Sequence, residues 1–204
     1  MFELLLWLLL CALAGFCAKL VDERVDSALP IPAITAALLA LLYGAAAGIL
    51  ATSTPLSSLF IALAVSALLA NKLDHPLHLL GLLAFTAVLL ARPISSFDVW
   101  LFSLFLALGL LDELKLRLLR PLAVLNEQRL WVPAGCLALA LWDATSPALN
   151  WSNLPATFSS LSEHGLLFLL AIVCFDAAYR LAGAMAQKAF KRPSVRMASK
   201  RRRR

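Results

Sequence analysis

Charged residues are scarce in this sequence, and their scarcity excludes an ordinary soluble domain. Only 15% of the 204 residues are charged and 62% are hydrophobic, whereas soluble domains are roughly 45–50% apolar and 25% charged. The mean hydropathy of +0.86 agrees with this composition. We therefore predict an integral membrane protein.

The sequence also has no motif that defines a reaction. It contains no Gly-x-Ser-x-Gly or phosphate-loop pattern, and no lysine lies in its last apolar segment, which argues against a retinal Schiff base. The four cysteines have no Cys-x-x-Cys spacing and are predicted to be small buried hydrophobic residues. His75 and His78 are predicted to be solvated or capping residues, because His164 falls on the opposite side and cannot complete a metal site with them.

Apolar segments occupy most of the chain. A membrane-spanning helix needs about 20 mostly apolar residues, and seven segments meet or approach this length. The first is expected to be retained rather than cleaved, because Glu3 and the missing basic residues do not fit a signal peptide. The fold class is therefore an all-α polytopic bundle of about seven transmembrane helices over residues 1–187, followed by a basic, flexible cytoplasmic tail over 188–204. The segments are 2–21, 31–51, 55–70, 76–91, 97–111, 130–149 and 165–186.

The distribution of basic residues predicts the orientation of the bundle. With seven spans, every Lys and Arg except Arg92 falls on one side. Lys and Arg are enriched in cytoplasmic loops. We expect the N-terminus outside, the C-terminus in the cytoplasm, and a multi-pass protein of the cell membrane.

The second apolar segment carries small residues at every fourth position. Such spacing lines one helix face and lets a second backbone approach closely. We expect this face to pack against another helix of the same chain, with dimerisation around Gly44 and Gly48 as the alternative. The small residues are Ala36, Ala40, Gly44, Gly48 and Thr52.

Aspartates stand at the cytoplasmic ends of alternate apolar segments. Asp22, Asp74, Asp112 and Asp176 should therefore approach the same side of the bundle. Carboxylates bind hard divalent cations, and Mg²⁺ commonly takes one or two of them together with phosphate oxygens. The hypothesis is a Mg²⁺ site formed by these four residues, with nearby cations binding a substrate phosphate. Those cations are Lys19, Lys72, Arg120 and Arg180.

Each aspartate also has a structural interpretation. Asp22 can be a solvated flanking residue, and Asp74 can cap the fourth helix. Asp112 can pair with Lys115 while Glu113 pairs with Arg117. Asp176, the most deeply placed, can form an ion pair with Arg180 or serve a site, since buried charges in membranes are costly.

Two short stretches resemble the aspartate-rich motifs of the UbiA prenyltransferases. They are Asn71-x-x-Asp74 and Asp112 followed by Arg120-Pro121-Leu122. Neither stretch repeats Asp at the four-residue spacing with which those enzymes bind magnesium. The chain also has fewer predicted spans, so we do not assign it to that family.

Three classes of function remain open. The first is a Mg²⁺-dependent enzyme that acts on a lipid or isoprenoid phosphate. The second is a cation or proton transporter or channel that uses Asp176 and Asp112, and the third is a non-catalytic scaffold. Membrane lipids are the expected partners, with anionic lipid at the basic tail, and no nucleic acid is expected.

Overall fold

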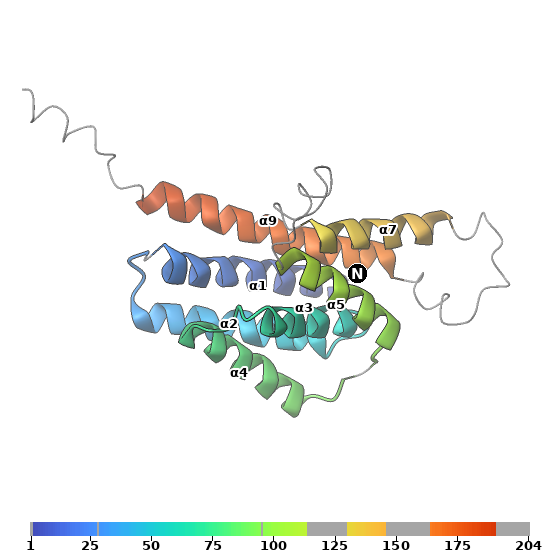
Figure 1. Ribbon diagram of the computed structural model, residues 1–204, viewed down its shortest axis with the longest axis horizontal. Helices are drawn as coiled ribbons and strands as arrows, with labels where there is room; N and C mark the ends of the chain where they lie inside the picture. The colour runs from blue at the N-terminus through green and yellow to red at the C-terminus, as the bar shows by residue number, and fades with distance from the viewer. Residues whose placement is uncertain (1, 28, 95, 114–129, 146–163, 191–204) are drawn as a thin grey trace, which may run out of the picture.

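The computed structural model describes residues 2–27, 29–94, 96–113, 130–145 and 164–190. Within these ranges the chain forms seven helices and no strands, which confirms the predicted all-α bundle. The helices are α1 (Phe2–Asp26), α2 (Ala33–Ala51), α3 (Ser57–Leu69), α4 (Pro76–Ala91), α5 (Val99–Glu113), α7 (Trp131–Thr145) and α9 (Gly165–Phe190) (Figure 1).

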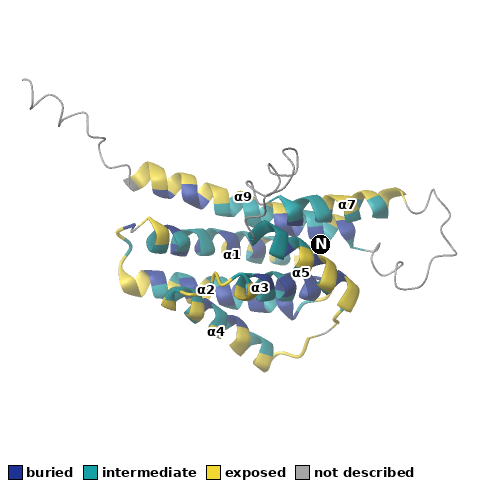
Figure 2. Ribbon diagram, viewed as in Figure 1, coloured by how far each residue is buried: buried dark blue, intermediate teal, exposed yellow. Residues whose placement is uncertain are grey.

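Helix lengths and outer surfaces suit a lipid environment. Helices α1, α2 and α9 are long and apolar enough to cross a membrane, and α3 and α4 are shorter apolar helices. Large apolar side chains face outward, among them Leu38, Leu83 and Leu141, and Figure 2 shows such exposed positions on most of the helices. Extended apolar surfaces of this kind mark membrane or partner contact.

Six of the helices form a closed ring. Each packs against the next in the order α1, α2, α3, α5, α7, α9, and α9 packs against α1. The remaining described helix, α4, lies outside this ring against α2. Helix α3 ends partway along α1 and α9 in the direction of the long axis (Figure 1). The polar residues that follow α3, Asn71, Lys72 and Asp74, therefore lie within the length of the bundle.

The small-residue face of α2 packs against α4, as predicted. A Cβ atom built on Gly44 would lie 2.0 Å from the carbonyl oxygen of Gly81, and one built on Gly48 would lie 2.8 Å from Cβ of Val88. The α1–α9 contact is equally close, because a Cβ on Gly15 would lie 2.2 Å from the carbonyl oxygen of Phe175. The backbones touch where side chains are missing.

Buried apolar side chains close the ring near the beginnings of α3 and α9. The rings of Phe105 and Phe168 meet edge to face, with centroids 5.2 Å apart. The predicted burial of the cysteines is confirmed for three of them, while Cys174 is half-buried, and all four are free thiols. We call this region the apolar plug; it comprises Cys11, Leu50, Leu56, Leu59, Phe105, Cys136 and Phe168.

Helix α9 extends beyond the predicted segment. It continues through Lys188 to Phe190, so the described helix includes the first residues of the region predicted to be a tail. Residues 191–204 lie outside the described residues, as do Lys115 and Arg117. The predicted ion pairs of Asp112 with Lys115 and of Glu113 with Arg117 therefore remain predictions.

Candidate functional site

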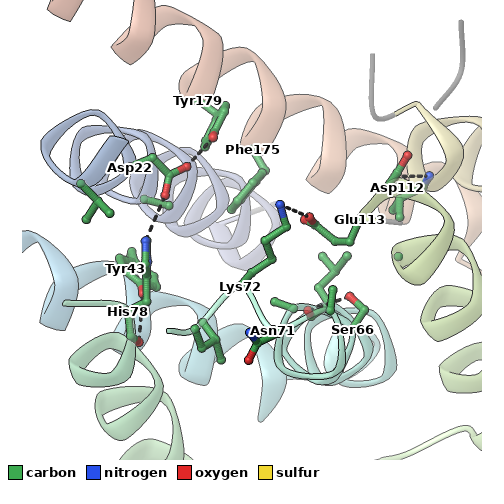
Figure 3. Close-up of a pocket in the computed structure, with 18 of the residues that line it drawn as sticks. Asp22, Tyr43, Ser66, Asn71, Lys72, His78, Asp112, Glu113, Phe175 and Tyr179 are labelled. Atoms are coloured by element: carbon green, nitrogen blue, oxygen red, sulfur yellow. Dashed lines mark hydrogen bonds and ion pairs between the residues drawn. The ribbon is translucent and has the colours of Figure 1, made fainter. Parts of the chain in front are cut away.

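A polar cavity lies beside the apolar plug, further along α1, α3, α5 and α9. Its volume is about 700 Å³. Residues in the last described turns of α3 and α5, together with the α3–α4 loop, form much of its wall (Figure 3). Its polar lining residues are Asp22, Asp26, Tyr43, Ser66, Asn71, Lys72, Asp74, His78, Asp112, Glu113 and Tyr179.

Asp22 connects three helices at one side of the cavity. Its Oδ2 atom accepts a hydrogen bond from the hydroxyl of Tyr179 on α9. Its Oδ1 atom lies 3.6 Å from Nε2 of His78 on α4 (Figure 3). Asp22 thus faces other helices and the cavity, and is not merely a solvated flanking residue.

The end of α3 directs a lysine across the cavity. The N–H of Asn71 donates to the carbonyl of Leu68 at 3.1 Å and that of Lys72 donates to Ala67 at 3.0 Å, which is the Schellman pattern of a helix terminus. Asn71 has φ of 54°, a conformation that asparagine tolerates better than most residues. Lys72 then points toward α5, where its Nζ lies 3.6 Å from Oε2 of Glu113 (Figure 3).

Asp112 holds the beginning of α7. Its Oδ1 accepts the N–H of Trp131 at 2.8 Å and its Oδ2 accepts the N–H of Val132 at 2.9 Å. The first N–H groups of a helix have no partner within the helix, and they favour a negative charge. Asp112 therefore joins α5 to α7 while it lines the cavity.

The α4 terminus differs from the prediction. Asp74 lines the cavity, but the N-cap of α4 is His75, whose Nδ1 accepts the N–H of Leu77 at 3.2 Å. The interpretation of Asp74 as the cap is therefore wrong, and the capping role predicted for the histidines holds for His75. His78 instead faces Asp22 in the cavity.

Other predicted site residues lie elsewhere. The Asp176 carboxylate accepts a hydrogen bond from Nε of Arg180 at 2.7 Å, and neither residue lines the cavity. Their side chains are 40% and 54% exposed. Lys19 forms an ion pair with Glu23 at 3.0 Å, and Arg120 lies outside the described residues. Of the eight predicted site residues, the cavity contains Asp22, Lys72, Asp74 and Asp112.

The cavity has a strongly negative lining. Five acidic residues and one lysine line it, and such a concentration of one sign of charge attracts cations. Within the described part of the chain, however, no three His, Cys, Asp or Glu side chains are arranged closely enough to hold a metal by themselves. The predicted set of four aspartates remains a prediction.

Sequence reasoning missed several polar cavity residues. They include Tyr43, Ser66, His78 and Tyr179. One signal was available, since the chain has two tyrosines and both line the cavity. A phenol is amphipathic, and its hydroxyl needs a hydrogen-bond partner when the ring is buried. In a chain this apolar, the two tyrosines therefore indicate where polar partners lie.

A second cavity adjoins the first. Its volume is about 190 Å³, and apolar residues of α2, α3 and α4 form most of its wall. Tyr43, Phe175 and Leu73 line both cavities, so they form the boundary between them. Because the polar and apolar spaces share these walls, a molecule with a polar head and an apolar tail matches both.

No family model matches the chain, and no curated protein or solved structure is significantly similar to it. The fold and the site define an all-helical bundle with membrane-length helices and an acidic cavity.

Proposed function

We propose that this protein binds a lipid or isoprenoid phosphate together with a divalent cation in the polar cavity, and acts on it there as a Mg²⁺-dependent enzyme. The observation that carries the proposal is the junction of an acidic cavity with an apolar one. A soluble metabolite would have no use for the apolar space. An amphiphilic substrate would use both.

The charges of the cavity favour a cation–phosphate pair over a phosphate alone. Five carboxylates would repel a bare phosphate, whereas Mg²⁺ would offset part of both charges. Mg²⁺ usually keeps several waters and takes one or two carboxylates plus substrate phosphate oxygens. A cluster of three protein ligands is therefore not required, and Asp22 and Asp74 are the proposed ligands.

Lys72 is the proposed phosphate-binding residue. Lys72 is the lysine in the cavity lining. Its Nζ lies 3.6 Å from Oε2 of Glu113, which is longer than a direct charged hydrogen bond, so the ammonium group can still bind phosphate. An ammonium group binds phosphate as a point charge. Asp112 is excluded from the proposed ligands because both of its oxygens already accept backbone N–H groups of α7.

The same proposal includes a membrane orientation. The basic residues favour the N-terminus outside and the C-terminus in the cytoplasm. The cavity lies beside the last described residues of α1, α3 and α5. The predicted orientation assigns these residues to the cytoplasmic side. The substrate would then enter from the inner leaflet of the cell membrane.

A cation or proton pathway has weaker support. Its two predicted residues do not share the cavity, because Asp176 pairs with Arg180 outside it. The apolar plug also lies beyond the cavity, between it and the buried serines Ser57 and Ser58 at the beginning of α3. A scaffold without chemistry is the outcome to expect if the experiment below finds no ligand.

Thermal unfolding of the purified protein in detergent tests the proposal. Farnesyl phosphate and Mg²⁺ are added separately and together, and a native-state ligand raises the Tm with its concentration. We expect the largest increase when both are present, and we expect Asp22→Asn and Lys72→Gln to reduce it.

The matched control is Asp176→Asn, which removes an acid outside the cavity and should keep the full ligand response. Equal stabilisation by farnesyl phosphate with and without Mg²⁺ would contradict the cation requirement. No stabilisation in any combination would contradict the proposed function.

A further inference from the structure

The apolar cavity has the size and lining of a binding site for hydrocarbon. Apolar cavities on the order of 150 Å³ stay dry and accept apolar molecules, and this one measures about 190 Å³. Its walls include Ala47 on α2, Ala64 on α3 and Leu82 on α4. Small side chains on facing helices leave the space open.

The helices around this cavity leave a route toward the outside of the bundle. Helices α3 and α4 both pack on α2, but they do not pack closely on each other. Both helices carry exposed apolar side chains, with Leu69 on α3 63% exposed and Leu83 on α4 66% exposed. A chain that leaves between α3 and α4 therefore passes over apolar surface.

Tyr43 marks the boundary between the polar and apolar spaces. Its hydroxyl donates to the backbone carbonyl of His78 at 3.4 Å. Its ring lies against Gly81, where a built Cβ would be 2.2 Å from the ring carbon Cζ. Gly81 lines the apolar cavity and His78 lines the polar one, so Tyr43 contacts a residue of each.

We infer that the apolar cavity between α2, α3 and α4 holds the first part of the ligand's hydrocarbon tail, with the head in the polar cavity and the junction beside Tyr43. This inference rests on the proposed function and adds the tail-binding site to it. The substrate class is a phosphate on a long apolar chain. The shared wall residues are the reason for assigning head and tail to one molecule.

Photolabelling of the full-length protein in phosphatidylcholine nanodiscs tests the tail site. The probes are decyl phosphate and decyl alcohol, each with a diazirine at mid-chain, used with Mg²⁺. We expect the decyl phosphate probe to label cavity residues of α2, α3 and α4. Unlabelled decyl phosphate should compete more than tenfold better than butyl phosphate or inorganic phosphate, because burial of two further CH₂ groups already corresponds to about tenfold.

Variants that fill the cavity provide the control. Ala64→Phe should reduce cavity labelling about tenfold, while Ala87→Phe, at an exposed position of α4 outside both cavities, should leave it unchanged. Ala47→Phe fills the opposite wall and replaces Ala64→Phe if that variant does not fold. Labelling confined to the outer surface, or equal in both filled variants and the parent, would overturn the tail site.

The two proposals can fail separately. If decyl alcohol labels the cavity while decyl phosphate does not, the tail site stands and the phosphate head is wrong. If decyl and butyl phosphate compete equally, the head site stands and the tail site is wrong.

Discussion

The Asp22 carboxylate accepts a hydrogen bond from the Tyr179 hydroxyl, which lies 157 positions later in the chain. This bond joins α1 to α9, and the same carboxylate lies 3.6 Å from Nε2 of His78 on α4. Lys19 places its Nζ 5.0 Å from the centre of the Tyr179 ring, on the same pair of helices. The beginning and the end of the described bundle therefore meet at the polar cavity.

Removing the Tyr179 hydroxyl should destabilise the bundle. Tyr179→Phe leaves an Asp22 oxygen without its donor, and because the Asp22 side chain is 26% exposed and can be hydrated, we expect a loss of about 0.5–1.5 kcal/mol. The matched control is Tyr43→Phe, whose hydroxyl bond to His78 is long at 3.4 Å and should cost less. Chemical unfolding in detergent measures both variants. Equal losses of unfolding free energy would mean that the Asp22–Tyr179 bond stabilises the bundle no more than the Tyr43–His78 bond does.

Removing the Asp112 charge should weaken the beginning of α7. An asparagine there has one carbonyl oxygen for two N–H groups that now bond to separate oxygens. Asp112→Asn should therefore cost about 1–2 kcal/mol of unfolding free energy. Asp98 is a suitable control, because the N–H groups of Trp100 and Leu101 on α5 share its Oδ1 atom, and Asp98→Asn keeps one oxygen acceptor for them.

Hydrogen–deuterium exchange of α7 is a second measurement of the Asp112 cap. The amides of Trp131 and Val132 should exchange faster in Asp112→Asn than in Asp98→Asn. Unchanged protection in both variants would show that the cap is not needed to hold α7.

The sequence predicted the helices well because hydropathy in this chain is nearly continuous. All seven described helices begin within two residues of the predicted segments, and α9 begins at the predicted Gly165. The face of α2 was also predictable, since small residues at every fourth position leave room for another backbone. Which helix would use that room was not predictable, and the structure shows that it is α4.

The site was only partly predictable because its residues meet through tertiary packing. Asp22 and Asp74 end apolar segments, which is a visible signal, but the same signal drew attention to Asp176. The position of Asp176 on α9, outside the cavity and beside Arg180, depends on helix rotation. Likewise, Asp112 accepts the N–H of Trp131, 19 residues later in the chain. A partner at that distance cannot be predicted from helical spacing within one segment.

Adding a methyl group between α2 and α4 should separate these helices. In Gly44→Ala the new Cβ would meet the backbone oxygen of Gly81 at 2.0 Å, and rigid backbone cannot yield easily. Overpacking of this kind costs about 1–3 kcal/mol, which offsets the helix propensity of about 1 kcal/mol that alanine gains over glycine.

Gly183→Ala is the control for the α2–α4 contact. Its Cβ would meet Cε of Lys19 at 2.8 Å, and that flexible side chain can move. We expect Gly44→Ala to lower the Tm and Gly183→Ala to leave it unchanged or raise it. A higher Tm for Gly44→Ala would contradict a close contact between the α2 and α4 backbones.

The orientation of the bundle can be tested at the C-terminal end of the chain. A Ser194→Cys variant adds a thiol beyond α9, and the four native thiols should react little because three are buried and one is half-buried. With the C-terminus in the cytoplasm, a membrane-impermeant maleimide should label this thiol only after the membrane is opened. Labelling in intact cells would contradict the predicted orientation. Every loop would then lie on the opposite side of the membrane, because the orientation is predicted from basic residues on the same side as the tail.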